Sequence, residues 1–231
     1  MDDSKKYQHL FFDLDNTVTR SRSPISDSMK TLLEKLSKNI IIISGASVKQ
    51  IMDQMGGVSC YTMGQNGNHA VRGAHTLWED NLTALEISEI EEHIARLPRS
   101  WQVPDENDLL ENRGSQISLS IYGHHAPVSE KERFDPDQAK RRAMLHAVPL
   151  YSDTVEVKIA GTTCLDYFRK GRNKGYNVAR LIEHETWNKD DCIYFGDAIY
   201  PGGNDETVYG VIETQGVKDP QDTYSKLTAM Q

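Results

Sequence analysis

Three short apolar runs, each followed by polar residues able to do chemistry, constrain the fold of this chain most. They are His9–Phe12 before Asp13, Ile40–Ile43 before Ser44, and Cys192–Phe195 before Gly196-Asp197. Apolar runs of this length with polar neighbours are typical of buried strands. We therefore expect three strands of one sheet that is covered on both faces.

Segments with helical spacing of apolar residues separate these runs. The first opens at Pro24, can be capped by Ser26 or Asp27, and places one apolar stripe on its surface: Met29, Leu32, Leu33 and Leu36. A second covers Val48–Met55 and stops at Gly56-Gly57. A third presents Val178, Leu181 and Ile182. Strands that alternate with helices predict an α/β fold, a Rossmann-like parallel sheet with crossover helices.

The pattern changes between residues 82 and 168. Apolar spacing predicts a helix over Thr83–Leu97 and a basic helix over Asp135–Val148, whose Lys140-Arg141-Arg142 run we assign to a solvated face. Polar and apolar residues alternate in Gln116–Ile121, which predicts a half-exposed strand. The sequence predicts a hairpin that turns at Gly161 and pairs Val155–Ile159 with Cys164–Phe168. We expect a core of residues 1–81 and 169–231, interrupted by an inserted α+β cap of residues 82–168 with an antiparallel sheet.

Composition and charge exclude several classes of protein. The length of 231 residues suits one large domain or two small ones. The 26 Lys and Arg against 34 Asp and Glu give a net charge of 26 − 34 = −8, which disfavours nucleic acid and anionic membranes as partners. The longest apolar run, Ile40–Ile43, is far too short to span a bilayer, and Met1–Lys6 does not lead into a secretory signal. The three cysteines form no CxxC pair, which favours a reducing, cytoplasmic location.

The polar residues after the strands are expected to meet, because ligands of parallel α/β sheets bind beyond the carboxyl ends of the strands. The set consists of Asp13, Asp15, Ser44, Lys174, Asp197 and Asp205. Clustered carboxylates repel one another unless a cation lies between them, and oxygen-rich sites with substrate phosphate suit Mg²⁺. A lysine and a serine beside them would stabilise a transferring phosphoryl group. Taken singly, each residue has a plainer role as a turn acid, a helix cap or a solvated lysine; the joint pattern favours function.

These motifs resemble those of the haloacid dehalogenase-like phosphotransferase superfamily. They are Phe12-Asp13-Leu14-Asp15-Asn16-Thr17, Ser44, Lys174, and Gly196-Asp197 followed by Pro201-Gly202-Gly203-Asn204-Asp205. The position of the cap and Gln65-Asn66-Gly67 are similar to subclass IIB, and nearly the whole chain resembles eukaryotic-type phosphomannomutases.

The resemblance implies a role for each core residue. Asp13 would be the nucleophile that becomes phosphorylated, and Asp15 the general acid and base. Mg²⁺ would be held by Asp13, the backbone carbonyl of Asp15, and Asp197, with Asp205 in support. Ser44 and Lys174 would hold the phosphoryl oxygens, and Asn204 belongs to the same substrate-binding loop.

The resemblance also implies substrate-binding residues outside the acid motifs. Arg22, Arg113 and Asp166 match family positions directly, and Arg133 matches the last cap arginine if two extra residues are allowed, with Lys131 as the competing choice. The chain departs from the family at three places: His124 replaces the middle cap arginine, Cys164 replaces a hydroxyl residue, and Asn16 replaces a glycine.

We therefore expect a Mg²⁺-dependent enzyme that hydrolyses a sugar phosphate, or a similar small phosphate ester, through an aspartyl-phosphate. Weaker binding of phosphate by the cap, with His124 in place of an arginine, slightly favours hydrolysis. A phosphatase needs only one phosphate at Asp13 and then water. One alternative is a phosphomannomutase that uses a hexose bisphosphate, and another is a catalytically silent binding protein of this fold. A homodimer through the cap is implied by the family alone.

Overall fold

The computed structural model describes residues 7–230, so the interpretation of Met1–Lys6 lies outside the described residues. The chain divides into two compact units. One contains the residues up to Glu79 and those from Arg172 onward, and the other is Asp80–Gly171. We call the first unit the core and the second the cap. Among the described residues, no helix has the length and apolar character needed to cross a bilayer.

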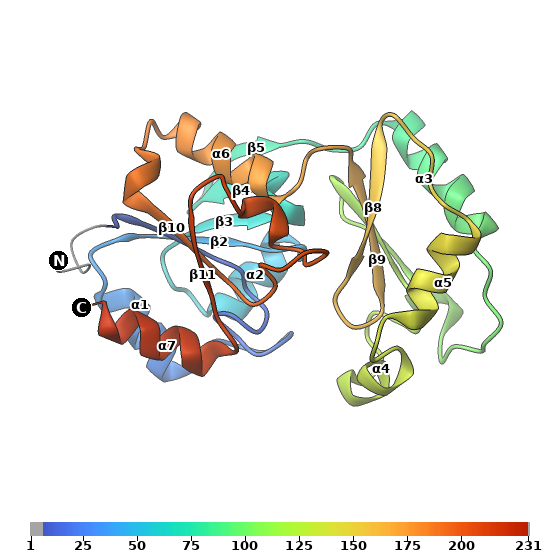
Figure 1. Cartoon of the computed structure of the whole chain (residues 1–231), viewed down its shortest axis with the longest axis horizontal. Helices are drawn as coiled ribbons and strands as arrows, with labels where there is room; N and C mark the ends of the chain where they lie inside the picture. Colours follow the sequence, from blue (N-terminus) through green and yellow to red (C-terminus); the bar gives the residue numbers. More distant parts are fainter. Residues whose placement is uncertain (1–6, 231) are drawn as a thin grey trace. The chain divides into compact units, whose positions relative to one another are not determined.

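The core is built on a seven-stranded sheet in the order β11-β10-β1-β2-β3-β4-β5 (Figure 1). Its strands are β1 (His9–Phe12), β2 (Asn39–Ile43), β3 (Tyr61–Gly64), β4 (His69–Arg72), β5 (His75–Glu79), β10 (Cys192–Gly196) and β11 (Glu213–Gly216). The strands from β11 to β3 are parallel, whereas β4 and β5 pair antiparallel. The expected parallel sheet is thus mixed, because the η2 turn (Gln65–Gly67) and Gly73, with φ of +58°, reverse the chain without a crossover helix.

Four helices cover the core sheet: α1 (Asp27–Lys35), α2 (Val48–Met55), α6 (Lys174–His184) and α7 (Pro220–Ala229). Ser26 caps α1, and Gly56 ends α2 in the left-handed conformation, as the sequence predicts. Side chains of β1 alternate between the faces: Leu10 and Phe12 pack with α1, α2 and α7, and Phe11 packs with α6. β1 is therefore buried on both faces, and its carboxyl end is held firmly in the middle of the sheet.

The cap has a four-stranded antiparallel sheet in the order β6-β7-β9-β8. Its strands are β6 (Leu110–Asn112), β7 (Gln116–Ser120), β8 (Val155–Ala160) and β9 (Cys164–Arg169), and its helices are α3 (Ala84–Arg96), α4 (Val128–Phe134) and α5 (Ala139–Ala147). The expected hairpin across Gly161 is present, with φ of +49° at the glycine. Short 3₁₀ turns complete the chain: η3 (Glu106–Asp108) in the cap, and η4 (Lys189–Asp191) and η5 (Glu206–Val208) in the core.

Two cap elements differ from the sequence-based expectation. The helix expected over Asp135–Val148 begins only at Ala139, because Pro136 disfavours a helical backbone at Asp135, where α4 ends. The expected half-exposed strand β7 is buried on both faces, since its polar side chains contact other polar groups. Ser118 donates to Asp166, and Ser120 lies 3.0 Å from the Thr163 hydroxyl.

Candidate active site

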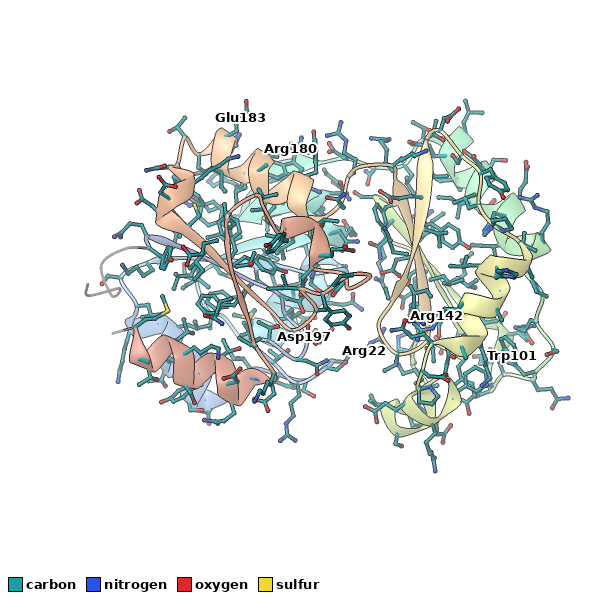
Figure 2. The ribbon with its side chains drawn as sticks, viewed as in Figure 1. Arg22, Trp101, Arg142, Arg180, Glu183 and Asp197 are labelled. Carbon is teal, nitrogen blue, oxygen red and sulfur yellow. The ribbon has the colours of Figure 1, made fainter. Side chains whose placement is uncertain are left out.

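The carboxyl ends of β1 and β10, with the loop after β10, bring three acids together. Asp13, Asp197 and Asp205 each place a carboxylate oxygen within 4.8 Å of the others. Asp13 follows β1, Asp197 follows its neighbour β10, and the Asp13 backbone N–H donates to the Phe195 carbonyl. Figure 2 labels Asp197 at the end of the core where β10 stops. The convergence expected at the ends of parallel strands thus places these three acids side by side.

Lys174 lies inside this acid cluster. Its Nζ atom is 2.6 Å from Oδ1 of Asp13 and 2.6 Å from Oδ1 of Asp205. The side chain is buried, so the alternative of a solvated lysine is wrong. Lys174 begins α6, whose N-cap Asn173 accepts a hydrogen bond from the Tyr176 N–H, and this cap fixes where the lysine enters the site.

The electrostatics of the cluster favour an additional cation. Burial raises the pKa of Asp13 well above its usual value, against the opposing charge of Lys174. Burial also raises the pKa of Asp197, and the nearby Asp205 adds to the effect. Burial alone would lower the pKa of Lys174, but the charges of Asp13 and Asp205 outweigh it and raise that pKa. The three carboxylates offer oxygen atoms as metal ligands, and they outnumber the single ammonium of Lys174. Such a site suits a hard divalent cation.

Two glycines allow the loop after β10 to approach the acids. A Cβ atom on Gly196 would lie 2.4 Å from Oδ2 of Asp205, and one on Gly203 would lie 2.0 Å from the Ala198 carbonyl oxygen. Neither contact is possible for a real side chain, so both positions require glycine.

Tyr194 is a member of the site that sequence reasoning missed. Its buried hydroxyl donates to Oδ1 of Asp205 at 2.6 Å and lies 3.5 Å from Nζ of Lys174. Burial raises the pKa of this phenol well above its ordinary value. The available signal was a tyrosine in an otherwise apolar strand, because a buried phenol needs a hydrogen-bond partner.

The structure places the other predicted core residues around this cluster. The Asp15 carboxylate is not part of it: Oδ1 accepts from the Arg22 backbone N–H at 2.8 Å and from Nε2 of Gln54 at 3.3 Å. Buried Ser44 follows β2, and its Oγ accepts from the Ala46 N–H. Asn204 is exposed in the loop before Asp205.

Asn16, the departure from the family glycine, has a structural explanation. Its φ of +60° is a left-handed conformation that asparagine tolerates better than most side chains. Its side chain also hydrogen-bonds Asp197, and this contact lowers the pKa of that acid against the effect of burial.

A second polar cluster lies in the cap, around Asp166. Ser118 Oγ donates to Oδ1 of Asp166 at 2.6 Å, and Arg113 attracts the same carboxylate while Nη2 of Arg113 donates to Glu111 at 2.6 Å. Burial raises the pKa of Asp166, and the charge of Arg113 opposes the rise. The structure thus brings Arg113 and Asp166 together, and it adds Glu111, which the sequence analysis did not single out.

The ring of His124 belongs to this cluster. Its Nε2 lies 3.1 Å from the Ser118 carbonyl, to which it donates, and its Nδ1 lies 3.7 Å from Oε2 of Glu111 and 4.0 Å from Sγ of Cys164. Lys131 is also buried here, with Nζ donating to the His124 carbonyl at 2.9 Å. Both departures in the cap, His124 and Cys164, therefore contact each other.

Arg133 lies away from these residues. It is exposed on α4, and its Nε donates to the Ser129 carbonyl of its own helix. Lys131 therefore lies in this cluster and Arg133 does not, because two residues along α4 turn a side chain toward a different face.

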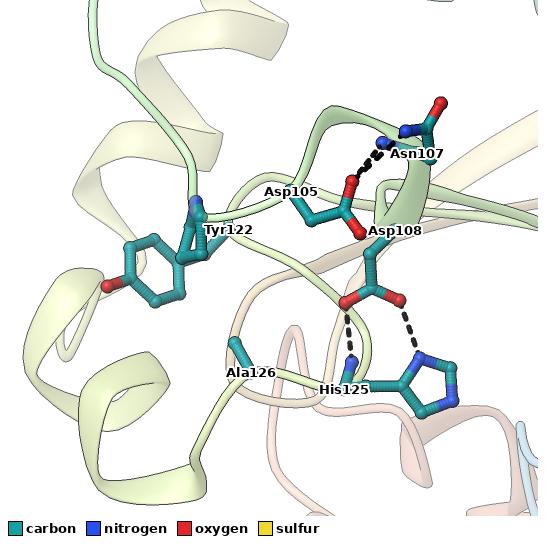
Figure 3. Close-up of a pocket in the computed structure, with 7 residues that line it drawn as sticks. Asp105, Asn107, Asp108, Tyr122, His125 and Ala126 are labelled. Carbon is teal, nitrogen blue, oxygen red and sulfur yellow. Dashed lines mark hydrogen bonds and ion pairs between the residues drawn. The ribbon is translucent and has the colours of Figure 1, made fainter.

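A pocket of about 360 Å³ on the cap contains none of the predicted site residues. Its lining is Pro104, Asp105, Asn107, Asp108, Tyr122, His125 and Ala126. Figure 3 shows the carboxylate of Asp108 accepting from both the backbone N–H and the Nδ1 of His125. The carboxylates of Asp105 and Asp108 thus accept hydrogen bonds from neighbouring residues of the cap.

Comparisons with known proteins agree with this architecture. Residues 29–231 match the family model described as eukaryotic phosphomannomutase. The phosphomannomutase of Encephalitozoon cuniculi is 25% identical, over 94% of this chain and 91% of its own length. That of Saccharomyces cerevisiae is 26% identical, over 96% and 93%. The solved structure of the subclass IIB sugar phosphatase BT4131 superposes with a TM-score of 0.61 at 14% identity, covering 96% of this chain and 98% of that one. The chain belongs to the eukaryotic phosphomannomutase family, and its fold is similar to that of the subclass IIB sugar phosphatase.

Proposed function

We propose that this protein is a phosphomannomutase that interconverts mannose 1-phosphate and mannose 6-phosphate through a hexose bisphosphate. One observation carries the choice of reaction: the match to the phosphomannomutase family extends across the whole cap as well as most of the core. This reverses the preference for hydrolysis that the sequence analysis gave. The chain is in either case a phosphoryl-transfer enzyme.

The chemistry follows from the residues around Asp13. A carboxylate oxygen of Asp13 attacks phosphorus, the bond from phosphorus to the sugar oxygen breaks, and the Asp15 carboxyl gives that oxygen a proton. Lys174 neutralises charge beside Asp13; Asp205 holds Lys174 in place, and Tyr194 holds Asp205. The phosphoryl group on Asp13 then passes to the free 6-hydroxyl of mannose 1-phosphate, and Asp15 accepts the proton of that hydroxyl. The bisphosphate that forms gives its 1-phosphoryl group to Asp13, Asp15 protonates the leaving oxygen, and mannose 6-phosphate is released.

We assign Mg²⁺ to Asp13, Asp197 and the backbone carbonyl of Asp15. When bound, the ion would neutralise phosphoryl charge. Asp205 already receives Lys174, Tyr194 and the Ala198 N–H, so we assign it to positioning Lys174 instead of holding the metal. In the cap, we assign binding of the sugar phosphate to Arg113, Lys131 and Asp166.

The test is a parallel assay with Mg²⁺ and mannose 1-phosphate, with and without a trace of hexose 1,6-bisphosphate. Free phosphate and mannose 6-phosphate are both followed. Isomer that depends on the bisphosphate, with little free phosphate, is the expected result.

A phosphatase stays the second candidate because of His124. Its Nε2 is engaged by the Ser118 carbonyl and its Nδ1 faces Glu111, which leaves the ring poorly placed to serve as a phosphate anchor. Phosphate release without isomer in the same assay would establish this candidate and overturn the mutase.

A further inference from the structure

The carboxylate of Asp15 is fixed on one oxygen only. Oδ1 accepts from the Arg22 backbone N–H at 2.8 Å and from Nε2 of Gln54 at 3.3 Å. Oδ2 accepts no hydrogen bond from any residue between 7 and 230. The two donors therefore set the plane of the carboxyl group and leave Oδ2 as the oxygen that can carry and release a proton.

The position of Gln54 is itself fixed by the helix α2. It lies in the last turn of α2, a helix that starts with a capping box between Ser47 and Gln50. Its backbone carbonyl accepts from the Ile25 N–H at 2.8 Å. A side chain on a capped helix positions a partner more accurately than one on a loop.

The amide of Gln54 also binds the loop that carries Asp15. Nε2 lies 3.2 Å from the Thr19 hydroxyl and 3.3 Å from the Ser23 carbonyl. Arg22, whose N–H is the second donor to Asp15, has a φ of +51°, and this left-handed turn directs the N–H back toward the acid. One side chain thus joins the helix, the loop and the acid.

We propose that Gln54 is a positioning residue for proton transfer by Asp15. The inference rests on the proposed function, in which Asp15 protonates the leaving oxygen. In that step a bond forms between Asp13 and phosphorus, the bond from phosphorus to the leaving oxygen breaks, and the proton on Oδ2 of Asp15 moves to that oxygen. The Gln54 side chain hydrogen-bonds Asp15, Thr19 and Ser23, and it keeps the Asp15 carboxyl turned so that Oδ2 is available.

This role predicts a dependence on the leaving group. A sugar alkoxide is a strong base and needs the proton as it leaves, whereas p-nitrophenolate is stable without it. General acid catalysis typically contributes about 10²- to 10⁴-fold, so losing the orientation of Asp15 should cost about tenfold or more with a sugar phosphate. The cost with p-nitrophenyl phosphate should stay within about threefold, because the proton contributes little there.

The experiment measures the rate at which Asp13 is phosphorylated in a single turnover, with glucose 1,6-bisphosphate and with p-nitrophenyl phosphate. The variants are Gln54→Leu, which removes the donor, and Gln54→Glu, which keeps the shape and fails to donate. Thr19→Val is the matched control, since it removes another Gln54 contact in the same loop and leaves the backbone pairing of Thr19 with Asp15 in place. The expected result is a selective loss with the bisphosphate in both Gln54 variants and an unchanged ratio of the two rates in Thr19→Val.

Two outcomes overturn the proposal. An equal loss with both phosphate donors would show that Gln54 only supports the loop, and an unchanged ratio in Gln54→Glu would show that the donor is not needed. Failure of the proposed function looks different, because the unmodified protein would then form no mannose 6-phosphate in the bisphosphate-dependent assay, whatever the ratio of the two single-turnover rates.

Discussion

Nε of Arg141 lies 2.7 Å from Oδ2 of Asp135, and both side chains are buried in the cap. Nη1 of the same arginine donates to the carbonyls of Ala160, Gly161 and Cys164 around the β8–β9 turn. Arg141 therefore ties α5 to the hairpin that carries Asp166. The expectation that Arg141 lies on a solvated helix face is wrong. Arg141 stands in a run of basic residues that is typical of a solvated face, yet it forms a buried ion pair with Asp135.

Arg141→Met is expected to destabilise the cap strongly. Removing one partner of a buried ion pair leaves the Asp135 charge uncompensated, which typically costs about 3–5 kcal/mol. Urea unfolding followed by circular dichroism measures the change. Arg142→Met, at the adjacent exposed position shown in Figure 2, should change the free energy of unfolding by less than about 0.5 kcal/mol. Equal effects in the two variants would contradict the role of the ion pair.

The core site was predictable from sequence because its residues follow a general rule. Asp13 and Asp197 follow the ends of strands, Lys174 starts α6, and Asp205 lies in the loop after β10; parallel topology brings the ends of the strands together. No such rule places Gln54, whose amide reaches Asp15 from 39 positions away along the chain.

The cap was less predictable because its sheet breaks the usual relation between polarity and exposure. The alternation of polar and apolar residues in β7 normally indicates that one face of the strand is exposed to solvent. The polar side chains of Gln116, Ser118 and Ser120 are nevertheless fully buried. Their hydrogen bonds depend on partners in β9 and the following turns, which one strand's sequence does not reveal. The same limit applies to Lys131 and Arg133. Which of the two side chains is buried depends on where α4 begins, and the sequence did not reveal that it begins at Val128.

His93 is expected to make stability depend on pH. Its Nε2 donates to the Val148 carbonyl, and its Nδ1 lies 2.9 Å from the Tyr167 hydroxyl, which can donate to it when the buried ring is neutral. Burial lowers the pKa of His93 below its ordinary 6.5. The unfolded chain thus binds the proton more readily, and stability is present above pH 6.5 and lost as the pH falls below it.

The check compares the free energy of unfolding at pH 7.5 and pH 5.5 in the unmodified protein and in His93→Gln. A glutamine side chain cannot titrate, so the loss on acidification should be smaller in the variant. His75→Gln, at an exposed position, should keep the full loss. A loss as large in His93→Gln as in the unmodified protein would assign the effect to other groups.

Mg²⁺ is expected to stabilise the core. A ligand that binds the folded state alone, at 100 times its dissociation constant, adds about 2.7 kcal/mol to the free energy of unfolding. Thermal unfolding with increasing Mg²⁺, and again after chelation with EDTA, measures the shift. Asp197→Asn should remove most of the shift, whereas Asp53→Asn on the exposed face of α2 should keep it. A shift unaffected by Asp197→Asn would place the ion elsewhere.

Lys131→Met is expected to raise KM for mannose 1-phosphate by about tenfold, since charge-assisted hydrogen bonds contribute about 1.5–3 kcal/mol. Arg133→Met should change KM by less than about twofold, because this side chain is exposed and contacts its own helix. Steady-state kinetics with p-nitrophenyl phosphate serves as the control, and neither variant should affect it. A larger effect from Arg133→Met would restore the assignment made from sequence.

Asp13→Asn is expected to abolish phosphoenzyme formation and turnover while the fold stays intact. The amide cannot attack phosphorus, yet it keeps the size of the carboxyl group and removes one of three clustered negative charges. Lys174 retains Asp205 as its partner at 2.6 Å, so the buried ammonium is not left alone. Mass spectrometry of the protein after incubation with glucose 1,6-bisphosphate tests for the phosphoryl group, and circular dichroism tests the fold. A phosphorylated Asp13→Asn protein would show that another side chain is the nucleophile, and the nearby Asp15 would be the first residue to examine.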